Sequence, residues 1–582
     1  MKDFRTKTCG EIRESDVGKT VRIAGFVETI RDFGGLVFLD IRDMYGVTQV
    51  VTSAESKDVD MISHIPVESS VTVEGKVRER SLDTVNEKIA TGKVEIYIDD
   101  IKVLGKRRKE LPFEIGDEKV REELRLKYRY LDLRSKKLQD NLKLRAELLQ
   151  FLRLQMISKD FLEVQTPILT SSSPEGARDY LVPSRLHHGK FYALPQAPQQ
   201  FKQLLMCSGI DKYFQIAPCF RDEDARSDRA PGEFYQLDME MSYAGQEDVF
   251  EVMEPVMYET FKKFSDKEVS TYPFLRIPYK ESMEKYGTDK PDLRNPLVII
   301  DLTEFFQRCT FKPFHGLTVR SITVKGHMSK GFHEKMLDFA QSIGMAGLGY
   351  LEVQEDMSFK GPIDKFIPDD MKKELIEKTG LEKEDTIFFI ADYEKKANFL
   401  AGQIRTELAK RLELIDESKV AFCWITDFPM YELDESGKLG FCHNPFSMPT
   451  GGMEALETQD PLDICADQYD LVCNGIELAS GAVRNHDPEI MCKAFSIVGY
   501  DEEYIKEKFG AMYEAFSFGA PPHAGIAPGI DRMIMILTGA ETIREVIAFP
   551  LSGKAEDLMM GAPSFVTREQ LRELSLKIVE DK

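Results

Sequence analysis

The sequence predicts an α+β protein that begins with a small β-barrel and contains an inserted α+β domain. Residues 19–104 consist of short apolar stretches separated by turn residues, which favours a series of short strands. From residue 136 onward the pattern mixes strands with helices. Between residues 295 and 416 it changes to helices alternating with strands and many lysines, as expected for an inserted domain. With 582 residues, the chain is long enough for about three to five domains.

Five strand-like segments and one short helical segment near Met61 make up residues 19–104. This length and strand number favour a barrel of the oligonucleotide-binding kind. In the string GLVFLDIRD, Phe38 shares a face with Leu36 and Asp40, and residues 37, 39 and 41 share the other. Phe38 is therefore either a partly buried strand aromatic or a platform on which an RNA base stacks. The residues alone leave both interpretations open.

Charge and cysteine content favour a large soluble enzyme. The net charge of −22 is unfavourable for a nucleic-acid partner, but residues 105–109 form the basic run GKRRK, so an RNA-binding protein with local basic patches stays possible. Its association with RNA should be strongly salt-sensitive. No stretch reaches the roughly 18 apolar residues of a membrane span, and the N-terminus resembles no leader, so we expect a cytoplasmic, unprocessed protein. Nine cysteines without a CxxC pair predict reduced thiols, with no disulfide and no structural zinc.

The remaining chain divides by changes in pattern. After the barrel, residues 111–135 form a charged connector into a long helix, whose leucines suit a core or a dimer interface. These leucines are Leu142, Leu144, Leu148, Leu149 and Leu152. We expect the following parts: a barrel at 1–110, the connector at 111–135, a catalytic domain split into 136–294 and 417–557, the inserted domain at 295–416 and a C-terminal extension with a helix at 558–582.

Four strings carry the polar residues of greatest interest. CFRDEDAR (residues 219–226) places Arg221 and Glu223 two apart, so that on a strand both would point to one face. GEFYQLDMEMSY (residues 232–243) alternates Phe234, Gln236, Asp238 and Glu240 at period two, as a second strand would. GAPPHAGIAPGIDRMIMIL (residues 519–537) predicts a glycine- and proline-rich turn into an apolar helix. FLEVQTPIL (residues 161–169) predicts the end of a helix and a strand entered through Pro167.

In this order, these four strings resemble the three signature motifs of the class II aminoacyl-tRNA synthetases, and their details are similar to the bacterial-type aspartyl enzymes. The string YGTDKPDLRNP (residues 286–296), at the start of the inserted domain, resembles a hallmark of that type. The resemblance covers essentially the whole chain. It implies an antiparallel sheet of about six to seven strands flanked by helices, and a homodimer with Pro167 in its interface. It also implies ATP-dependent attachment of aspartate to the 3′ end of tRNA-Asp.

Adenylate formation requires positive charge around the phosphoryl oxygens of ATP. The chain contains no GxxxxGK[ST] loop, so a P-loop does not supply that charge, whereas arginines can, because their planar guanidinium binds phosphate bidentately. The resemblance implies that Arg221 contacts the α-phosphate and the substrate carboxylate, and that Arg532 binds the γ-phosphate. It implies that Glu223 accepts a hydrogen bond from the adenine amino group. The other residues implied for the ATP site are Asp222, Glu477, Gly529, Ile530 and Asp531.

Further site residues also follow from the resemblance. It implies that Mg²⁺ is held by Asp470 and Glu477, in keeping with the few protein carboxylates that this ion usually takes. Recognition of the aspartate side chain is assigned to the cations of Lys202 and Arg484, which should discriminate against asparagine. The rest of the aspartate site comprises Arg221, Glu175, Gln199, Gln236, Asp238 and His443. The anticodon residues are Phe38, Gln49 and Glu95.

Two other functions compete with this interpretation. An asparaginyl enzyme is disfavoured by the inserted domain and by YGTDKPDLR, and a non-catalytic RNA-binding relative by the presence of Arg221, Glu223, Glu477 and Arg532. The sequence leaves open whether tRNA-Asn is charged as well as tRNA-Asp. It also departs from the common pattern at Asn444 and at residues 230–232, which puts part of the ATP contact in question.

Overall fold

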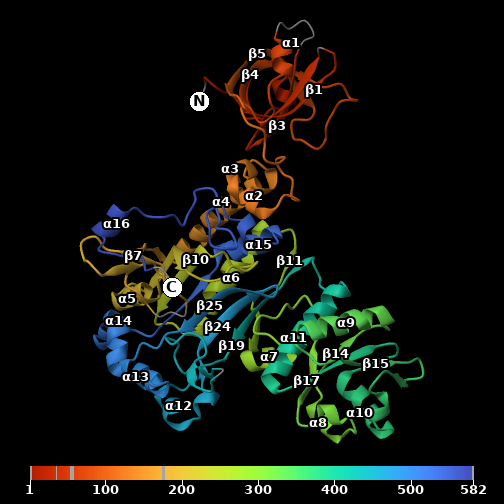
Figure 1. Cartoon of the computed structure of the whole chain (residues 1–582), viewed down its shortest axis with the longest axis vertical. Helices are drawn as coiled ribbons and strands as arrows, with labels where there is room; N and C mark the ends of the chain where they lie inside the picture. The colour runs from red at the N-terminus through yellow and green to blue at the C-terminus, as the bar shows by residue number, and fades with distance from the viewer. Residues whose placement is uncertain (1–2, 35, 53–57, 174–176, 435, 580–582) are drawn as a thin grey trace. The chain divides into compact units, whose positions relative to one another are not determined.

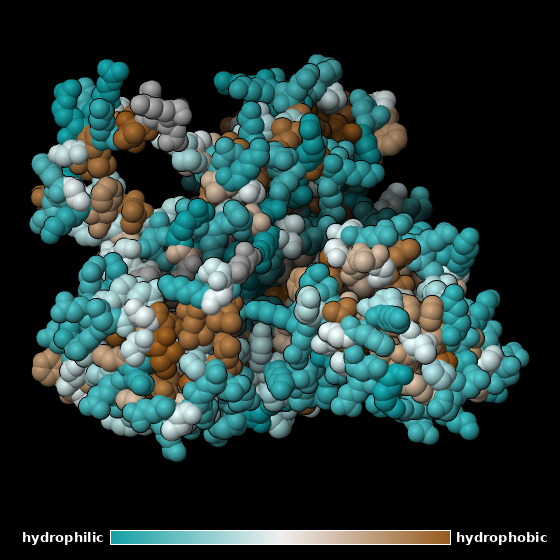
Figure 2. Space-filling view, turned by 60° about the horizontal axis from the view of Figure 1, so that its bottom comes forward, coloured by the Kyte–Doolittle hydropathy of each residue, from teal (hydrophilic) through white to brown (hydrophobic). Residues whose placement is uncertain are grey.

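The computed structural model describes residues 3–34, 36–52, 58–173, 177–434 and 436–579 (Figure 1). The chain divides into two compact units, residues 1–140 and residues 141–582. None of the helices in the described part of the chain is long and apolar enough to cross a membrane. Figure 2 shows one face of the molecule, on which hydrophilic residues predominate and hydrophobic residues form separate patches.

The first unit contains a closed five-stranded barrel in the order β1-β2-β3-β5-β4. Its elements are β1 (Thr20–Asp32), β2 (Val37–Asp43), β3 (Gly46–Val51), α1 (Val59–Ser63), β4 (Ser70–Glu79) and β5 (Val94–Gly105). The predicted five strands and the short helix near Met61 are confirmed. Val37, Leu39 and Ile41 are fully buried in the barrel core, whereas Phe38 lies on the opposite face of β2. Period-two patterning was sufficient to predict this division because one face of the strand is dry.

The connector folds onto the barrel within the first unit. It forms two short helices, α2 (Glu122–Lys127) and α3 (Arg129–Asp132). The Arg134 guanidinium lies 3.8 Å from the ring centroid of Phe26 and donates to a carboxylate oxygen of Glu68 at 2.8 Å. Stacking on an aromatic face together with a charge-assisted hydrogen bond fixes the orientation of Arg134.

The second unit is built on an eight-stranded sheet with the order β12-β19-β24-β25-β26-β10-β9-β6. The strands are β12 (Leu275–Pro278), β19 (Phe422–Thr426), β24 (Gln468–Cys473), β25 (Ile476–Val483), β26 (His523–Pro528), β10 (Gly232–Ser242), β9 (Lys212–Arg221) and β6 (Leu162–Glu163). The six central strands pair antiparallel, and the two edge strands pair parallel with their neighbours. The antiparallel part of the sheet thus has six strands, in line with the six to seven expected, and the short strands β12 and β6 extend it at the two edges.

Helices cover one face of this sheet with a hydrophobic core. Leu237, Met239 and Met241 of β10 are buried there with residues of α4 (Lys136–Ile157), α6 (Gln246–Phe264) and α15 (Ile530–Thr538). Leu148 and Leu152 of α4 belong to the same core and are fully buried. The sole tryptophan, Trp424, stacks on Phe250 with ring centroids 3.9 Å apart and donates to Glu254 at 2.9 Å. Because side chains alternate along a strand, the even-numbered residues of β10 lie on the opposite face.

The remaining elements surround the second face or form the inserted region. The inserted region, green to teal in Figure 1, has a five-stranded sheet with hydrophobic cores containing Phe306 and Phe388. Its elements are β13 (Ile299–Asp301), α8 (Thr303–Arg308), β14 (Thr318–Val324), α9 (Lys330–Ser342), β15 (Gly349–Val353), β16 (Phe359–Lys360), α10 (Asp369–Thr379), β17 (Thr386–Asp392) and α11 (Glu394–Arg411). The other helices are α5 (Gln199–Cys207), α7 (Tyr279–Tyr286), α12 (Gly452–Thr458), α13 (Pro488–Ile497), α14 (Glu502–Ser517) and α16 (Arg568–Glu573). Two-stranded ribbons pair β7 (Leu181–Pro183) with β8 (Phe191–Ala193), β11 (Glu268–Val269) with β18 (Lys419–Val420), β20 (Phe428–Pro429) with β23 (Cys465–Ala466), and β21 (Tyr431–Leu433) with β22 (Leu439–Phe441).

Two local predictions were wrong. The strand expected through Pro167 lies earlier, because β6 ends at Glu163, before the proline that cannot donate to a ladder. The segment expected as a turn before the apolar helix contains the strand β26, in which His523 to Pro528 pair with β10 and β25. Its glycine permits close packing, since a side chain at Gly525 would collide with Glu240.

Candidate active site

A cavity of about 390 Å³ opens on the sheet face opposite the hydrophobic core. Strands β9, β10, β24 and β25, helix α5 and the start of α15 contribute to its wall. The predicted site residues that line it are Gln199, Lys202, Arg221, Glu223, Gln236, Asp238, His443, Asp470, Glu477, Arg484, Gly529, Asp531 and Arg532. Residues more than 300 positions apart in the sequence therefore meet at one place.

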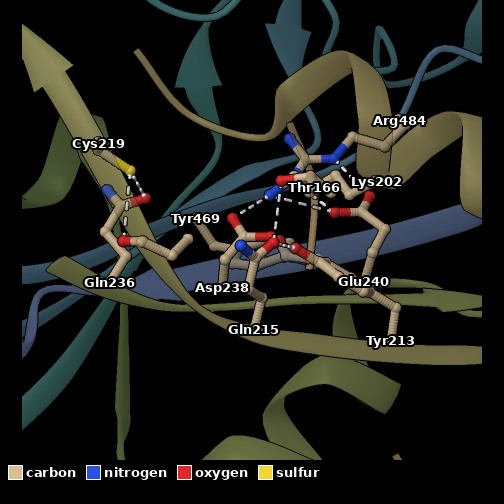
Figure 3. A network of polar contacts seen from close by, with 12 residues as sticks. Thr166, Lys202, Tyr213, Gln215, Cys219, Gln236, Asp238, Glu240, Tyr469 and Arg484 are labelled. Carbon is tan, nitrogen blue, oxygen red and sulfur yellow. Dashed lines mark hydrogen bonds and ion pairs between the residues drawn. The ribbon is translucent and has the colours of Figure 1, made fainter. Parts of the chain in front are cut away.

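Four buried charges form the floor of the cavity (Figure 3). Lys202 Nζ lies 2.8 Å from Asp238 Oδ2 and 3.4 Å from Glu240 Oε2. Arg484 donates to both oxygens of Glu240, from Nε at 2.7 Å and from Nη2 at 3.1 Å. The two cations are thus balanced by two carboxylates, so the protein alone leaves no net charge among these four groups.

The two carboxylates respond differently to burial. Burial raises the pKa of Asp238 above its usual value, and Lys202 offsets this only in part. Burial also opposes ionisation of Glu240, but Arg484 and Lys202 outweigh it and hold the pKa of Glu240 below its usual value. Asp238 Oδ1 is buried and accepts no hydrogen bond from any residue described. An unpartnered carboxylate oxygen at a cavity wall suits a cationic group of a ligand.

Further polar residues form hydrogen bonds beside these four charges. Tyr213 Oη and Thr166 Oγ1 both donate to Gln215 Oε1, at 2.9 and 3.0 Å, beside the charged cluster (Figure 3). Cys219 Sγ lies 3.4 Å from Gln236 Oε1, and Gln236 also pairs with the backbone of Gly529. These contacts fix the orientation of side chains that face the cavity.

Arginines stand at the other end of the cavity. The Arg221 guanidinium lies 5.0 Å from the Phe234 ring centroid, and its buried Nε has no hydrogen-bond partner in the described chain. Arg532 donates to Asp228 and lies 3.6 Å from Glu477 Oε1. Strand β9 ends at Arg221, so Glu223 lies beyond the strand rather than on one face with Arg221, although both line the cavity. Glu223 accepts from Arg229 at 2.6 Å.

Two acidic residues and a lysine occupy the side of the cavity formed by β24 and β25. Burial, together with the charge of Glu477, raises the pKa of Asp470 to about 8. Asp470 Oδ1 is buried and unpartnered within the described residues. Lys290 Nζ lies 3.3 Å from Glu477 Oε2. Among the residues described, no group of three or more His, Cys, Asp or Glu could hold a metal. Asp470 and Glu477 offer two carboxylates at this wall, and Mg²⁺ usually takes only one or two from a protein.

Some predicted residues have other surroundings. Ile530 is buried in the hydrophobic core, and neither it nor Asp222 lines the cavity. Asp531 lines the cavity, but its carboxylate accepts from Arg145 and from the backbone N–H of Tyr235 at 3.1 Å. Burial lowers the pKa of His443. Glu175 lies outside the described residues.

Several residues of the cavity and its floor were not predicted as site residues from the sequence, among them Glu240, Asp289 and Lys290. Glu240 stands in the period-two alternation of β10, where its link to Arg484 could not be inferred without the fold. Asp289 and Lys290 stand in YGTDKPDLRNP, a string whose resemblance to other sequences indicated the family but no role for these two side chains. The sequence feature that could have indicated Asp289 and Lys290 as site residues was their position in a charged, proline-containing string.

The three predicted anticodon residues lie on one face of the barrel. Gln49 Nε2 donates to Glu95 Oε2 at 2.8 Å, and Arg31 donates to Gln49 Oε1 at 3.2 Å. Phe38 is directly opposite Arg31 in the β1–β2 pairing, and its ring meets that of Phe33 edge-on at 5.8 Å. This face combines aromatic and base-edge polar groups, a combination suited to single-stranded RNA.

Comparison with protein families agrees with this geometry. Residues 121–553 match the family described as tRNA synthetases class II (D, K and N), and residues 21–104 match the OB-fold nucleic acid binding domain. The chain belongs to the class II tRNA synthetases. The family expected from the sequence motifs is confirmed.

Relatives of this synthetase match over the full length. Aspartate–tRNA(Asp/Asn) ligases of Rickettsia bellii (strain OSU 85-389) and Rickettsia prowazekii (strain Madrid E) are 54% and 53% identical, each covering 99% of this chain and 98% of the relative. Among solved structures, the aspartyl tRNA synthetase of Entamoeba histolytica has a TM-score of 0.58 at 21% identity, covering 94% of this chain and 92% of that one.

An asparaginyl enzyme has the same class II synthetase fold. The asparaginyl-tRNA synthetase from Pyrococcus horikoshii complexed with asparaginyl-adenylate has a TM-score of 0.57 at 19% identity, covering 94% of this chain and 97% of that one. Structures of both specificities thus share this fold about equally. The choice of amino acid has to be argued from the side chains of the cavity.

Proposed function

We propose that the chain is an aspartate–tRNA ligase, which activates L-aspartate with ATP and transfers it to the 3′ end of tRNA-Asp. The pair of buried cations, Lys202 and Arg484, beside the unpartnered Asp238 Oδ1 carries the proposal. Such a floor offers a carboxylate oxygen to an α-ammonium group and two cations to a side-chain carboxylate. The full-length relatives named aspartate–tRNA(Asp/Asn) ligases support the same choice.

Selection against asparagine follows from the charges. Glu240 engages one edge of the Arg484 guanidinium, and the other edge can donate to a ligand carboxylate. An asparagine side chain would offer the free edge of Arg484 only a neutral amide oxygen and would bring its N–H donors toward the two cations. A site built to bind a polar group strongly rejects an analogue that leaves its buried donors poorly paired. Gln199, Gln236, Glu175 and His443 are proposed to complete the aspartate site.

The arginine end is proposed to bind ATP. The aspartate α-carboxylate oxygen attacks the α-phosphorus, and the bond from that phosphorus to the bridging oxygen breaks as pyrophosphate leaves. Arg221 stabilises the charge that develops on the α-phosphoryl oxygens, and Arg532 that on the γ-phosphate. Glu223 is proposed to receive the adenine amino group. Asp470 and Glu477 would hold Mg²⁺, which supplies further positive charge at the phosphates when bound.

A pyrophosphate-exchange assay with aspartate and with asparagine tests the proposed function. We expect exchange with aspartate and a much lower rate with asparagine. Faster exchange with asparagine would identify an asparaginyl enzyme instead. Absence of exchange with both amino acids, in protein that is folded and binds tRNA, would identify a non-catalytic RNA-binding protein.

We propose that the barrel face binds the anticodon, and that the enzyme acts in the cytoplasm. The Rickettsia relatives are named for both tRNA-Asp and tRNA-Asn, which favours a second candidate function, the charging of both tRNAs. Charging assays with each purified tRNA decide between the two. Aspartylation of tRNA-Asp alone would reject the second candidate.

Replacing Phe38 with alanine is expected to weaken tRNA charging by roughly 1 to 3 kcal/mol, the range for one lost stacking platform. Adenylate formation should be unchanged, because Phe38 does not belong to the barrel core. The two assays and the melting temperature are measured side by side, with Tyr45→Ala, an exposed aromatic residue of the same barrel, as the control. A lower melting temperature with both reactions impaired would show a structural role instead.

We propose a homodimer that uses the apolar residues at the end of α4 and beyond. Leu154, Ile157, Leu162, Ile168 and Leu169 are 47–58% exposed. Placing charges there by Leu154→Asp with Ile157→Asp is expected to convert the dimer into monomers in analytical ultracentrifugation. Leu433→Asp, at another exposed apolar position, should leave the dimer intact. A double variant that stays dimeric would place the interface elsewhere.

A further inference from the structure

The segment YGTDKPDLRNP (residues 286–296) connects the cavity with the inserted region. Its Lys290 extends to the cavity wall, where Nζ lies 3.3 Å from Glu477 Oε2 and 2.5 Å from Asp289 Oδ2. The other carboxylate oxygen of Glu477 lies 3.6 Å from Arg532 Nη1. Glu477 is therefore held between two cations, and Lys290 is the one that the sequence motifs do not explain.

The C-terminal half of the segment is fastened by one side chain of the inserted region. Arg405 of α11 is buried and donates to three backbone carbonyls, those of Leu297 at 2.6 Å, Asn295 at 2.9 Å and Asp292 at 3.1 Å. Asn295 Nδ2 in turn donates to the Arg405 carbonyl at 3.4 Å. A guanidinium that binds two carbonyls of the segment and one just after it fixes the backbone there, because each carbonyl would otherwise be buried without a donor.

Close backbone packing removes the remaining freedom of the segment. Gly287 has a φ of +69°, and a side chain there would lie 2.4 Å from the Gly402 nitrogen of α11. At the other side, Asp292 packs on Gly475, in the turn between β24 and β25, where a side chain would lie 3.1 Å from the Asp292 Cβ. Strand β25 carries Glu477. The inserted region, the segment and the strand with Glu477 are thus in direct contact.

We infer that Lys290 is a positioning residue that acts through Glu477, and that the inserted region holds it there through Arg405. With its ammonium beside Glu477, Lys290 neutralises that carboxylate and competes with a divalent cation for it. The inserted region then adjusts how tightly the cavity binds the cation, although it provides no cavity ligand itself. The exchange assay below rests on the proposed function, whereas the cation titration stands without it.

The test is a titration of the free enzyme with Mn²⁺, followed by electron paramagnetic resonance, together with aspartate-dependent pyrophosphate exchange. In Lys290→Met we expect Mn²⁺ to bind about tenfold more tightly, since a positive charge within 4 Å of the ligand is removed. Exchange should nevertheless become slower, by a fall in kcat rather than a rise in aspartate KM. Lys290→Arg should restore the wild-type Mn²⁺ affinity.

Arg405→Met should change Mn²⁺ affinity in the same direction, by about three- to tenfold, although it removes no charge from the cavity wall. The double variant with Arg405→Met and Lys290→Met should bind Mn²⁺ as tightly as Lys290→Met alone, because both substitutions act through the same lysine. Arg411→Met, at the end of α11 and paired with the half-buried Glu407, is the matched control and should bind Mn²⁺ like wild type. Should Arg405→Met fail to fold, Arg405→Lys provides a milder loss of the three hydrogen bonds.

The proposed function and the proposed role of Lys290 are tested by different outcomes. If wild type shows no exchange with aspartate, the proposed function is wrong, and the Mn²⁺ titration still tests Lys290. Unchanged Mn²⁺ affinity in Lys290→Met would overturn the role of Lys290. Additive effects of the two substitutions, or an Arg405 variant that folds and binds Mn²⁺ like wild type, would overturn the link to the inserted region.

Discussion

Replacing Arg221 with alanine is expected to lower aspartate-dependent pyrophosphate exchange by at least 100-fold and to leave the fold intact. Preorganised charges at a developing oxyanion contribute about 3 to 4 kcal/mol to catalysis. The Arg221 guanidinium keeps hydrogen-bond donors free for a ligand, since its buried Nε is unpartnered and the group lies over Phe234. The measurements are exchange kinetics and thermal unfolding on the same protein.

Arg532→Ala provides a useful contrast. Its guanidinium donates to Asp228 and to Glu477 within the protein, so its loss should reduce both exchange and stability. Arg276→Ala, which breaks an exposed pair with Glu247, serves as the control and should behave like wild type. Near-normal exchange in Arg221→Ala would remove that residue from the proposed phosphate site.

Arg484→Leu is expected to weaken aspartate binding by about 3 to 5 kcal/mol while changing ATP binding little. Its Nε and Nη2 hold Glu240, and its other edge is proposed to bind the substrate side chain. The expected kinetic result is a large rise in aspartate KM, a small change in ATP KM and a narrower gap between aspartate and asparagine. An equal loss for aspartate and ATP would show that Arg484 supports the site as a whole.

This variant should also have a pH signature, because it leaves Glu240 buried with less positive charge. In the wild type, the lowered pKa of Glu240 contributes stability above the unfolded-state pKa, and this stability is lost as pH falls through the folded-state pKa. Without Arg484, burial should raise that pKa instead. The loss of melting temperature should therefore be larger at neutral pH than in mild acid. Glu240→Gln should lessen the pH dependence of the melting temperature, since it removes the ionisable group.

Strand patterning could be predicted from the sequence where one face is dry and the other polar. This condition holds in β2 and β10, so the faces of Phe38 and Asp238 were predictable. It fails for β26, because the glycines and prolines in and around this strand indicate a turn, although Gly525 permits close packing against Glu240. Edge strands of two to four residues, such as β6 and β12, contain too few alternations to be recognised.

The candidate site was predictable only where a residue stands in a family motif. Arg484 could be assigned in this way, but its bond to Glu240 joins residues 244 positions apart and depends on how β10 lies against β25 and β26. Lys290 was hidden for a similar reason, because its partner Glu477 lies on a distant strand. Pair interactions between strands are set by the tertiary arrangement, which local patterns do not encode.

The single tryptophan makes the second unit optically distinct from the barrel. Trp424 is fully buried against Phe250 in the core of the second unit, and residues 1–140 contain no indole. Fluorescence excited at the red edge of the protein absorption band therefore comes from Trp424 alone. The shift of its emission wavelength on denaturation reports the unfolding of the core around this residue. Circular dichroism follows both units, so a difference between the two transitions would measure how far the barrel and the synthetase core unfold independently.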